Sequence, residues 1–348
     1  MPLQLENKRL GADEKALLIA EVSANHDKDL DQALALVDIA ADTGWDCLKL
    51  QTYTAESLTV RSEHPSMLID AVWGKRNLFE LYESACMPME FHKPLFEKAR
   101  ERNLLPFTSV YDPRDLDFIE KLDCSIYKIA SFEMTFDALL ACVAQTGKPI
   151  ILSTGMATLP EIEHALEVLD KHGATQVVLL HCCSSYPAPL DQINLNAMTA
   201  MGERFDREVG YSDHTVGSIA AISAAAMGAV AIEKHFTNDP NREGPDHRFS
   251  ATPDIMQNIA KGVADIQVLK GSKEKTTTDA EKVSREKGRR SAFAVRDIPA
   301  GHIITEEDFR FIRPNAGIAA NTPELIIGKT LRESVKAGHP ILSSDLAV

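Results

Sequence analysis

The chain has 348 residues, of which 44% are hydrophobic, and it carries a net charge of −14. The apolar content is enough for a sizeable core and excludes a largely disordered chain, and the length suits a barrel of roughly 250 residues plus a small module. The acidic balance argues against a broad nucleic-acid or anionic-membrane surface, but it leaves room for a local anion site.

No leader peptide is expected, because the first twenty residues lack a basic stretch followed by an apolar one. The longest apolar region, 219–232, is half alanine and is interrupted by Ser223 and Gly228, which makes it too weak for a membrane span of roughly 20 residues. The six cysteines include no Cys-x-x-Cys spacing and predict reduced thiols in a cytoplasmic protein. We therefore expect neither nucleic acid nor membrane as a partner.

Eight short apolar stretches alternate with helical patterns between residues 17 and 270. Near-continuous apolar strands separated by helices predict a parallel sheet that is covered on both faces. After the first stretch, Leu30, Leu34, Val37 and Ala41 share a helical face, and Gly44 is expected to end that helix. The predicted strands are 17–22, 47–51, 104–109, 126–131, 150–154, 177–182, 208–212 and 230–235.

Eight such units predict a (β/α)8 TIM barrel over residues 1–270. A doubly wound open sheet is the alternative, but no Gly-x-Gly-x-x-Gly follows the first strand. About forty residues separate the second strand from the helix near 91–103, and connections of this length are often lids or binding loops. Trp73 and Tyr82 within it are expected to pack locally.

The C-terminal part is predicted to be a separate module. Residues 271–290 are polar and charged, as is typical of a linker, and residues 291–348 contain an internal repeat. Residues 298–302 (IPAGH) recur as 335–339 (VKAGH). The repeat predicts short strands related by pseudo-twofold symmetry, in a module too small for a large core.

In a (β/α)8 barrel, catalytic groups come from the C-terminal ends of the strands, and here those ends are strongly polar. We expect the polar side chains to converge on one mouth of the barrel. The residues concerned are Glu21, Lys49, Gln51, Ser109, Lys128, Ser131, Glu133, Ser153, Ser184, Tyr186, Ser212, His214, Glu233 and His235.

These residue types point to a particular chemistry. Two lysines with several hydroxyl groups make a site for phosphate or carboxylate. His214 and His235 end neighbouring predicted strands, and a pair of imidazoles suits a divalent metal whose other positions go to water and substrate. Glutamates can supply acid–base groups. The pattern predicts an enzyme that acts on an anionic, phosphorylated substrate with metal assistance.

Each of these residues also has a simpler interpretation. A single histidine at a strand end is usually a hydrogen-bonded structural residue. Lys128 could extend outward into solvent, and Glu133 and Glu233 could form surface ion pairs. Lys49 is harder to explain in this way, because a buried, unpaired ammonium group only destabilises a strand.

At the level of whole motifs, the chain resembles the sialic acid synthase family, the phosphoenolpyruvate-dependent synthases of nine-carbon sugar acids. The resemblance covers nearly the whole chain, and the C-terminal module resembles the family's antifreeze-like (SAF) domain, of β-clip type. The motifs that carry it are 21–26 (EVSANH), 49–52 (KLQT), 127–131 (YKIAS), 153–156 (STGM), 212–215 (SDHT), 233–236 (EKHF), 244–246 (GPD) and 313–314 (RP).

Three segments are similar to pseudaminic acid synthases within this family: 51–54 (QTYT), 81–85 (LYESA) and 246–250 (DHRFS). Residues 23–26 (SANH) also depart from the Gly-Ile-Asn-His of neuraminate synthases. This implies 2,4-diacetamido-2,4,6-trideoxy-β-L-altropyranose as the sugar. A neuraminate or legionaminate synthase with the same mechanism is the alternative. A non-catalytic carbohydrate-binding or ice-surface-binding protein is a more distant one.

The resemblance also implies a metal and a set of substrate contacts. His214 and His235 would bind Mn²⁺ or Mg²⁺, and Glu21 or Glu133 would orient a water molecule. Phosphoenolpyruvate would be held by Lys49, Ser109, Lys128, Ser131, Ser153 and Ser212. The amino sugar would face Glu21, Gln51, Ser184, Tyr186 and Asp246.

The resemblance also bears on Ser184 and on Arg313. The family often has Asn at the position of Ser184. Arg313 would reach from the C-terminal module into the barrel of a partner subunit and contact an N-acyl group of the sugar. The resemblance thus implies a domain-swapped homodimer with a composite active site.

Overall fold

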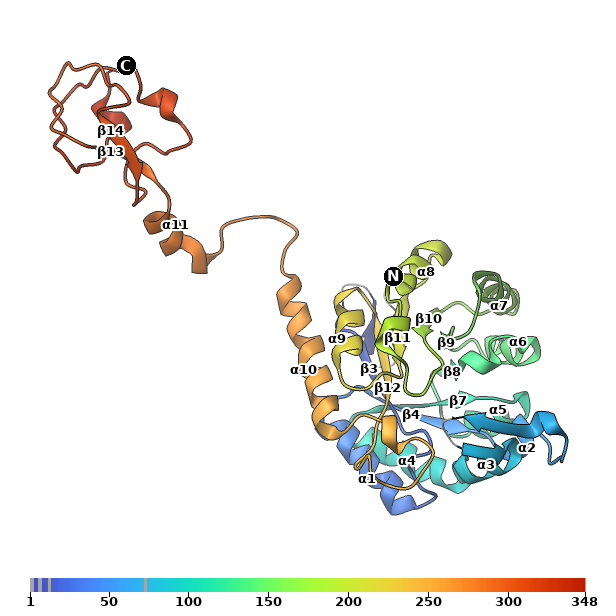
Figure 1. Ribbon diagram of the computed structural model, residues 1–348. Helices are drawn as coiled ribbons and strands as arrows, with labels where there is room; N and C mark the ends of the chain where they lie inside the picture. Colours follow the sequence, from blue (N-terminus) through green and yellow to red (C-terminus); the bar gives the residue numbers. More distant parts are fainter. Residues whose placement is uncertain (1–2, 6–7, 12–13, 72–73, 348) are drawn as a thin grey trace. The chain divides into compact units, whose positions relative to one another are not determined.

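The computed structural model describes residues 3–5, 8–11, 14–71 and 74–347, which divide into two compact units, Met1–Gly271 and Ser272–Val348 (Figure 1). Each unit has a buried apolar core of its own. Within these described ranges, no helix is both long enough and apolar enough to cross a bilayer.

The first unit is a closed barrel of eight parallel strands surrounded by helices, which confirms the predicted (β/α)8 fold over an open sheet (Figure 1). The last strand pairs with the first and closes the ring. The barrel strands in chain order are β3 (Leu17–Glu21), β4 (Cys47–Thr52), β7 (Leu105–Val110), β8 (Tyr127–Ile129), β9 (Ile150–Ser153), β10 (Val177–Cys182), β11 (Val209–Asp213) and β12 (Ala231–His235).

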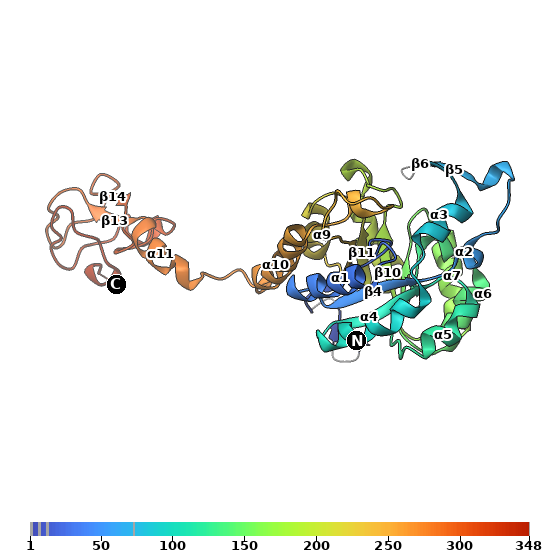
Figure 2. The same cartoon turned by 90° about the horizontal axis from the view of Figure 1, so that it is seen from below.

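The barrel strands are buried because side chains fill the interior while helices cover the outside. Every residue of β3 and of β7 is buried, for example. An antiparallel pair, β1 (Leu3–Leu5) and β2 (Lys8–Leu10), precedes the barrel. Figure 2 shows the surrounding helices from a second direction. They are α1 (Leu30–Asp42), α4 (Met89–Glu101), α5 (Leu116–Glu120), α6 (Asp137–Gln145), α7 (Leu159–Lys171), α8 (Asn196–Phe205), α9 (Ile219–Ala226) and α10 (Pro253–Lys270).

Helix α1 shows how the local sequence sets the limits of an element. The side chain of Asp29 caps its start by accepting hydrogen bonds from the backbone N–H groups of Asp31 and Gln32. Gly44, at φ +79°, reverses the chain after the helix, as predicted. The predicted apolar face is displaced by one residue, because the helix turns a different row toward the barrel: Ala33, Leu36, Val37 and Ala40.

The long connection between β4 and α4 has secondary structure of its own. It contains α2 (Ala55–Leu58), the antiparallel hairpin of β5 (Leu68–Ala71) and β6 (Gly74–Asn77), and α3 (Leu78–Ala85). The hairpin lies near α3 at one edge of the barrel unit (Figure 2). Trp73, which was expected to pack locally, lies outside the described residues.

The second unit is a small module of short antiparallel pairings. β13 (Ser291–Ala294) pairs with β14 (Phe309–Ile312), and α11 (Lys282–Gly288) lies within the segment expected to be a linker. The two repeat copies pair with each other: Ile298 and Val335 occupy equivalent positions and exchange two backbone hydrogen bonds of 2.8 and 2.9 Å. Such self-pairing of equivalent residues is what pseudo-twofold symmetry requires.

Candidate active site

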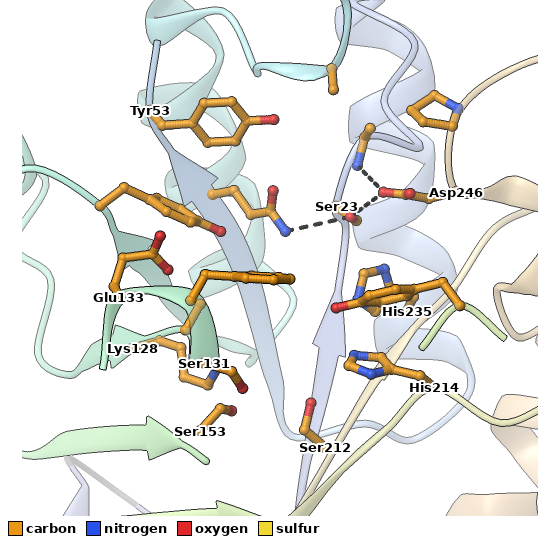
Figure 3. A pocket seen from close by; sticks show the side chains of 18 of the residues that line it. Ser23, Tyr53, Lys128, Ser131, Glu133, Ser153, Ser212, His214, His235 and Asp246 are labelled. Atoms are coloured by element: carbon orange, nitrogen blue, oxygen red, sulfur yellow. Dashed lines mark hydrogen bonds between the residues drawn. The ribbon is translucent and has the colours of Figure 1, made fainter. Parts of the chain in front are cut away.

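A cavity of about 330 Å³ lies at the C-terminal ends of the barrel strands. Figure 3 shows side chains from several strands and loops pointing into it. Most of the residues predicted from the strand ends line this cavity, so the expected convergence is confirmed. They are Lys49, Gln51, Lys128, Ser131, Glu133, Ser153, Tyr186, Ser212, His214, Glu233 and His235. Asp246, which the resemblance implied, lines the cavity as well.

The strand register explains why these side chains meet. Glu21 on β3 is in register with Lys49 on β4 and with His235 on β12. On the other side of β12, Glu233 is in register with Ser212 of β11. Because residues in register on neighbouring parallel strands lie side by side and point to the same face, the polar strand ends meet at the mouth of the barrel.

Four charged groups form a buried cluster at the base of the cavity. The Lys49 Nζ contacts the Glu21 carboxylate and lies 3.5 Å from Glu233 Oε1. The Lys128 Nζ lies 3.6 Å from the same Glu233 oxygen. Each of the four side chains is at most 4% exposed. The alternatives of a surface-paired Glu233 and an outward-pointing Lys128 are therefore wrong.

Burial and the mutual contacts of this cluster shift its pKa values in different directions. Burial raises the pKa of Glu21 to about 7, although Lys49 opposes the shift. Burial would also raise the pKa of Glu233, but Lys128 and Lys49 outweigh it and hold that pKa below its usual value. Glu21 therefore takes up a proton more readily than Glu233. Two ammonium groups beside one ionised carboxylate leave a positive charge that favours an anion.

A group of small polar residues lies beside the lysines. The backbone N–H of Gly155 donates a 2.9 Å hydrogen bond to Ser131 Oγ. A Cβ atom at position 155 would lie 2.2 Å from Ser184 Oγ and 2.6 Å from Cys182 Sγ, so this close approach requires glycine. Ser153 Oγ is buried and has no hydrogen-bond partner among the described residues, which is expected of a group that binds a ligand.

His214 and His235 lie together, with ring centroids 5.4 Å apart. The Nδ1–H of His214 donates to the Cys183 carbonyl at 2.8 Å, which leaves Nε2 with a free lone pair. Burial lowers the pKa of His214 to about 4 and the pKa of His235 well below its usual value. Nδ1 of His235 is buried and lacks a partner within the described part of the chain. Two adjacent neutral imidazoles fit a divalent metal.

A third part of the wall is suited to a neutral, partly apolar ligand. Gln51 Nε2 donates to Glu21 Oε1 at 2.7 Å, and the Tyr186 ring centroid lies 4.3 Å from that of His214. Tyr82 lines the cavity, so the expectation of purely local packing is wrong. Further apolar surface comes mostly from the long connection after β4, through Tyr53, Leu58, Ile69, Leu81 and Ala85.

Glu133 lies on the wall of the cavity, on the same side as Lys128 (Figure 3). Burial raises its pKa to about 7, while Lys128 opposes the shift. Its Oε2 is buried and has no hydrogen-bond partner in the described ranges. A carboxyl group with a pKa near neutrality and a free oxygen can exchange a proton with a ligand.

Four predicted site residues do not line the cavity. Glu21 lies beneath Lys49, Ser109 accepts a 3.1 Å hydrogen bond from Lys49 Nζ, and Ser184 Oγ lies 3.7 Å from Cys182 Sγ. Each of these three contacts a residue that lines the cavity. Arg313 is exposed in the second unit directly after β14, and its contact with a partner's barrel stays a prediction.

Several lining residues were not predicted as site residues: Ser23, Tyr53, Tyr111 and Cys182. Glu233, which was predicted at a strand end, lines the cavity with His235 because strand alternation puts residues two positions apart on one face. Ser23 and Tyr53 follow barrel strands in loops, where periodicity gives no direction for a side chain.

Residues 36–275 match the NeuB family, and residues 289–347 match the SAF domain. The chain belongs to the NeuB family. This membership confirms the resemblance to the sialic acid synthases and the prediction of an enzyme. The SAF match agrees with the repeat-containing module of the second unit.

Similar NeuB proteins differ in the sugar acid that they are named for. The chain is 36% identical to pseudaminic acid synthase of Helicobacter pylori over 330 residues, 94% of this chain and 97% of that protein. It is also 36% identical to N,N'-diacetyllegionaminic acid synthase of Campylobacter jejuni over 325 residues, 92% of this chain and 97% of that protein. The solved N-acetylneuraminic acid synthetase of Leptospira borgpetersenii superposes with a TM-score of 0.73 at 30% identity, covering 82% of this chain and 95% of that one.

Proposed function

We propose that this NeuB enzyme is a pseudaminic acid synthase. It condenses phosphoenolpyruvate with the open-chain form of 2,4-diacetamido-2,4,6-trideoxy-altrose and releases phosphate by cleavage of the carbon–oxygen bond. The observation that carries the proposal is one cavity that joins buried lysines with two neutral histidines, Lys49 and Lys128 with His214 and His235. The relatives named as pseudaminic acid synthases support the choice of sugar.

The lysine side of the cavity binds phosphoenolpyruvate. Lys49 and Lys128 attract the phosphate and carboxylate groups, and the hydroxyls of Ser131, Ser153 and Ser212 donate hydrogen bonds to them. The Ser153 Oγ, which has no hydrogen-bond partner among the described residues, is available to these oxygens. The same lysines stabilise the negative charge that builds up on the departing phosphate.

The histidine pair provides a metal site. His214 and His235 would hold Mn²⁺ or Mg²⁺, which polarises a carbonyl group as a Lewis acid when bound. Within the described residues, no group of three or more His, Cys, Asp or Glu side chains is arranged to hold a metal ion. A metal bound by the two histidines would therefore keep coordination positions for water and substrate. The hydrogen bond from His214 Nδ1 to Cys183 orients that ring toward the cavity with Nε2 available.

A carboxyl group is needed to take a proton from the water that adds to carbon 2 of the enolpyruvyl unit. Glu133 fits this role, because its pKa of about 7 allows it to accept a proton near neutrality at Oε2. Glu21 has a similar pKa but is fully buried and contacts Lys49. We assign proton transfer to Glu133 and a supporting electrostatic role to Glu21.

The sugar occupies the remaining wall. Gln51, Tyr186 and Asp246 face its polar groups, and the apolar side chains of the long connection contact its acetamido and 6-methyl groups. Arg313 of a partner subunit contacts an N-acyl group in a domain-swapped homodimer. A carbohydrate-binding protein without catalysis would have no need for buried lysines and perturbed carboxyl groups, which favours the enzyme.

The decisive experiment compares sugars. Purified protein with Mn²⁺ and phosphoenolpyruvate is given the 2,4-diacetamido-trideoxy altrose, its manno counterpart, or N-acetylmannosamine, and phosphate release and product mass are measured. Turnover of the altrose alone supports the proposal. Preferred turnover of either manno sugar would replace it with a legionaminate or neuraminate synthase, and no phosphate release with any sugar would support the binding protein.

A further inference from the structure

The loop that follows β3 has an unusual backbone. Ser23, Asp27 and Lys28 have φ values of 50°, 51° and 55°, in the left-handed region. They are three of the eight non-glycine residues with positive φ among the described residues. This conformation is unfavourable for a residue with a Cβ atom, and it persists where surrounding contacts hold it, often at functional sites.

Ser23 is held by contacts on both sides of its hydroxyl group. Its Oγ donates to Asp246 Oδ2 and accepts from Gln51 Nε2 at 3.4 Å (Figure 3). The backbone N–H of Ala24 also donates to Asp246 Oδ2, at 3.3 Å. Ser23 is 4% exposed and lines the cavity. Its side chain thus joins the loop after β3 to the loop after β12.

Further hydrogen bonds join the loop that contains Asp246 to the loop after β3. Ser250 Oγ donates to the Asp246 carbonyl at 2.7 Å and accepts from Asn25 Nδ2 at 2.8 Å. The buried His247 ring bridges Asp27 Oδ1 at 2.8 Å and Thr237 Oγ1 at 2.6 Å. The left-handed turn at Asp27 therefore also serves this attachment. Residues 22–28 and 237–250 are thus joined by hydrogen bonds, and they line the cavity through Ser23, Ala24, Pro245 and Asp246.

We propose that Ser23 is a positioning residue for the sugar. Its left-handed backbone directs the hydroxyl between Gln51 and Asp246 and sets the orientation of both side chains. A glycine at position 23 would relieve the backbone strain, but it would lose the hydrogen bonds of the hydroxyl group with Asp246 and Gln51. In the wild-type chain these hydrogen bonds offset the strain. Ser23 and Asp246 lie across the cavity from Lys128 and Ser153 (Figure 3), so the effect falls on the sugar. The inference rests on the proposed function.

Two substitutions separate the hydroxyl from the backbone. Ser23→Gly removes both the hydroxyl and the strain, whereas Ser23→Ala removes the hydroxyl and keeps the Cβ. We expect both variants to raise the KM for the sugar about tenfold, the loss expected for a hydrogen bond to a charged group, and to leave the KM for phosphoenolpyruvate within twofold. A Ser23→Gly enzyme with the wild-type sugar KM would overturn the inference.

A readout without substrate tests the positioning itself. Amide hydrogen exchange of residues 237–252 should be at least fivefold faster in both Ser23 variants than in wild type. The matched control is Asp206→Gly, because Asp206 is also left-handed, with φ 49°, but is exposed at the end of α8. This control should change neither the exchange of 237–252 nor the sugar KM.

The KM measurements and the amide exchange measurements together separate a failure of the inference from a failure of the proposed function. If wild-type protein fails to turn over any sugar, the proposed function fails, while exchange still reports whether Ser23 holds the Asp246 loop. Unchanged exchange in both Ser23 variants overturns the positioning role whatever the substrate proves to be. Equal loss of sugar and phosphoenolpyruvate binding would also contradict it, because it would show a general disturbance of the cavity.

Discussion

At the scale of single residues, the surroundings of each side chain give residues of one type different pKa values. Glu233 stays ionised because two lysines face it, whereas burial raises the pKa of Glu133 and of Glu21 to about 7. His214 and His235 stay neutral because they are buried. Burial and neighbouring charges, and not the residue type alone, therefore decide which of these side chains can exchange a proton or bind a metal.

Glu133 should make the stability of the protein depend on pH. Its folded pKa of about 7 lies above the usual value of 4.5, so its stabilising contribution is complete below about pH 4.5 and is lost as pH rises toward 7. The difference in unfolding free energy between wild type and Glu133→Gln should therefore fall by roughly 1–3 kcal/mol over this range. Urea unfolding at several pH values measures it. The exposed Glu163→Gln serves as control, and parallel curves for Glu133→Gln would contradict the burial argument.

His235 should be required for metal binding and turnover but not for folding. We expect His235→Ala to weaken Mn²⁺ binding at least tenfold in calorimetry and to lower kcat by a factor of about 10³ or more, with an unchanged circular dichroism spectrum. His164, exposed on α7 and bonded to Asp137, provides the control His164→Ala. Full activity of a metal-stripped His235→Ala enzyme would refute the metal role.

At the scale of elements, the two strands that carry the histidines are tied together outside the barrel interior. Lys234 Nζ donates to Asp213 Oδ2 at 2.7 Å and to the Thr215 carbonyl at 2.6 Å. Both charged side chains are almost completely buried. Since Asp213 precedes His214 and Lys234 precedes His235, this ion pair holds the two histidine-bearing strand ends in register.

Breaking this pair should cost much more than breaking a surface pair. Lys234→Met leaves Asp213 buried without its cation and should lower the unfolding free energy by about 3–5 kcal/mol. Adding Asp213→Asn should cause less further loss than the same change made alone, since the two residues act together. The exposed Lys336–Asp297 pair gives the control Lys336→Met, for which a much smaller loss is expected because water screens both charges. Equal effects of both lysine substitutions would contradict the account.

At the scale of the whole molecule, the chain combines a catalytic barrel with a self-paired SAF module. The predicted role of the module depends on Arg313, which is exposed after β14. Arg313→Ala should raise the sugar KM at least tenfold while leaving the phosphoenolpyruvate KM within twofold. Arg310→Ala, three residues earlier and also exposed, should change neither constant. Equal loss of both substrates in Arg313→Ala would refute the assigned contact.

The sequence predicts the barrel well because each strand is a buried apolar stretch with a polar end, and that pattern is local. It also predicts most of the cavity, since a polar residue at a strand end must lie near the mouth of a closed barrel. The contacts of Ser23 with Asp246 depend on two loops that are 223 residues apart in sequence. A left-handed φ at a serine and the folded hairpin after β4 leave no periodic signal, so they required the structure.

The central claim is that this cavity condenses phosphoenolpyruvate by carbon–oxygen cleavage. Phosphoenolpyruvate labelled with ¹⁸O at the bridging oxygen tests it directly, by mass spectrometry of the phosphate and the sugar acid formed with the altrose substrate. We expect the label to appear in phosphate, and we expect Lys128→Met, which removes a cavity cation, to form little product. Label retained in the sugar acid would show phosphorus–oxygen cleavage and contradict the account.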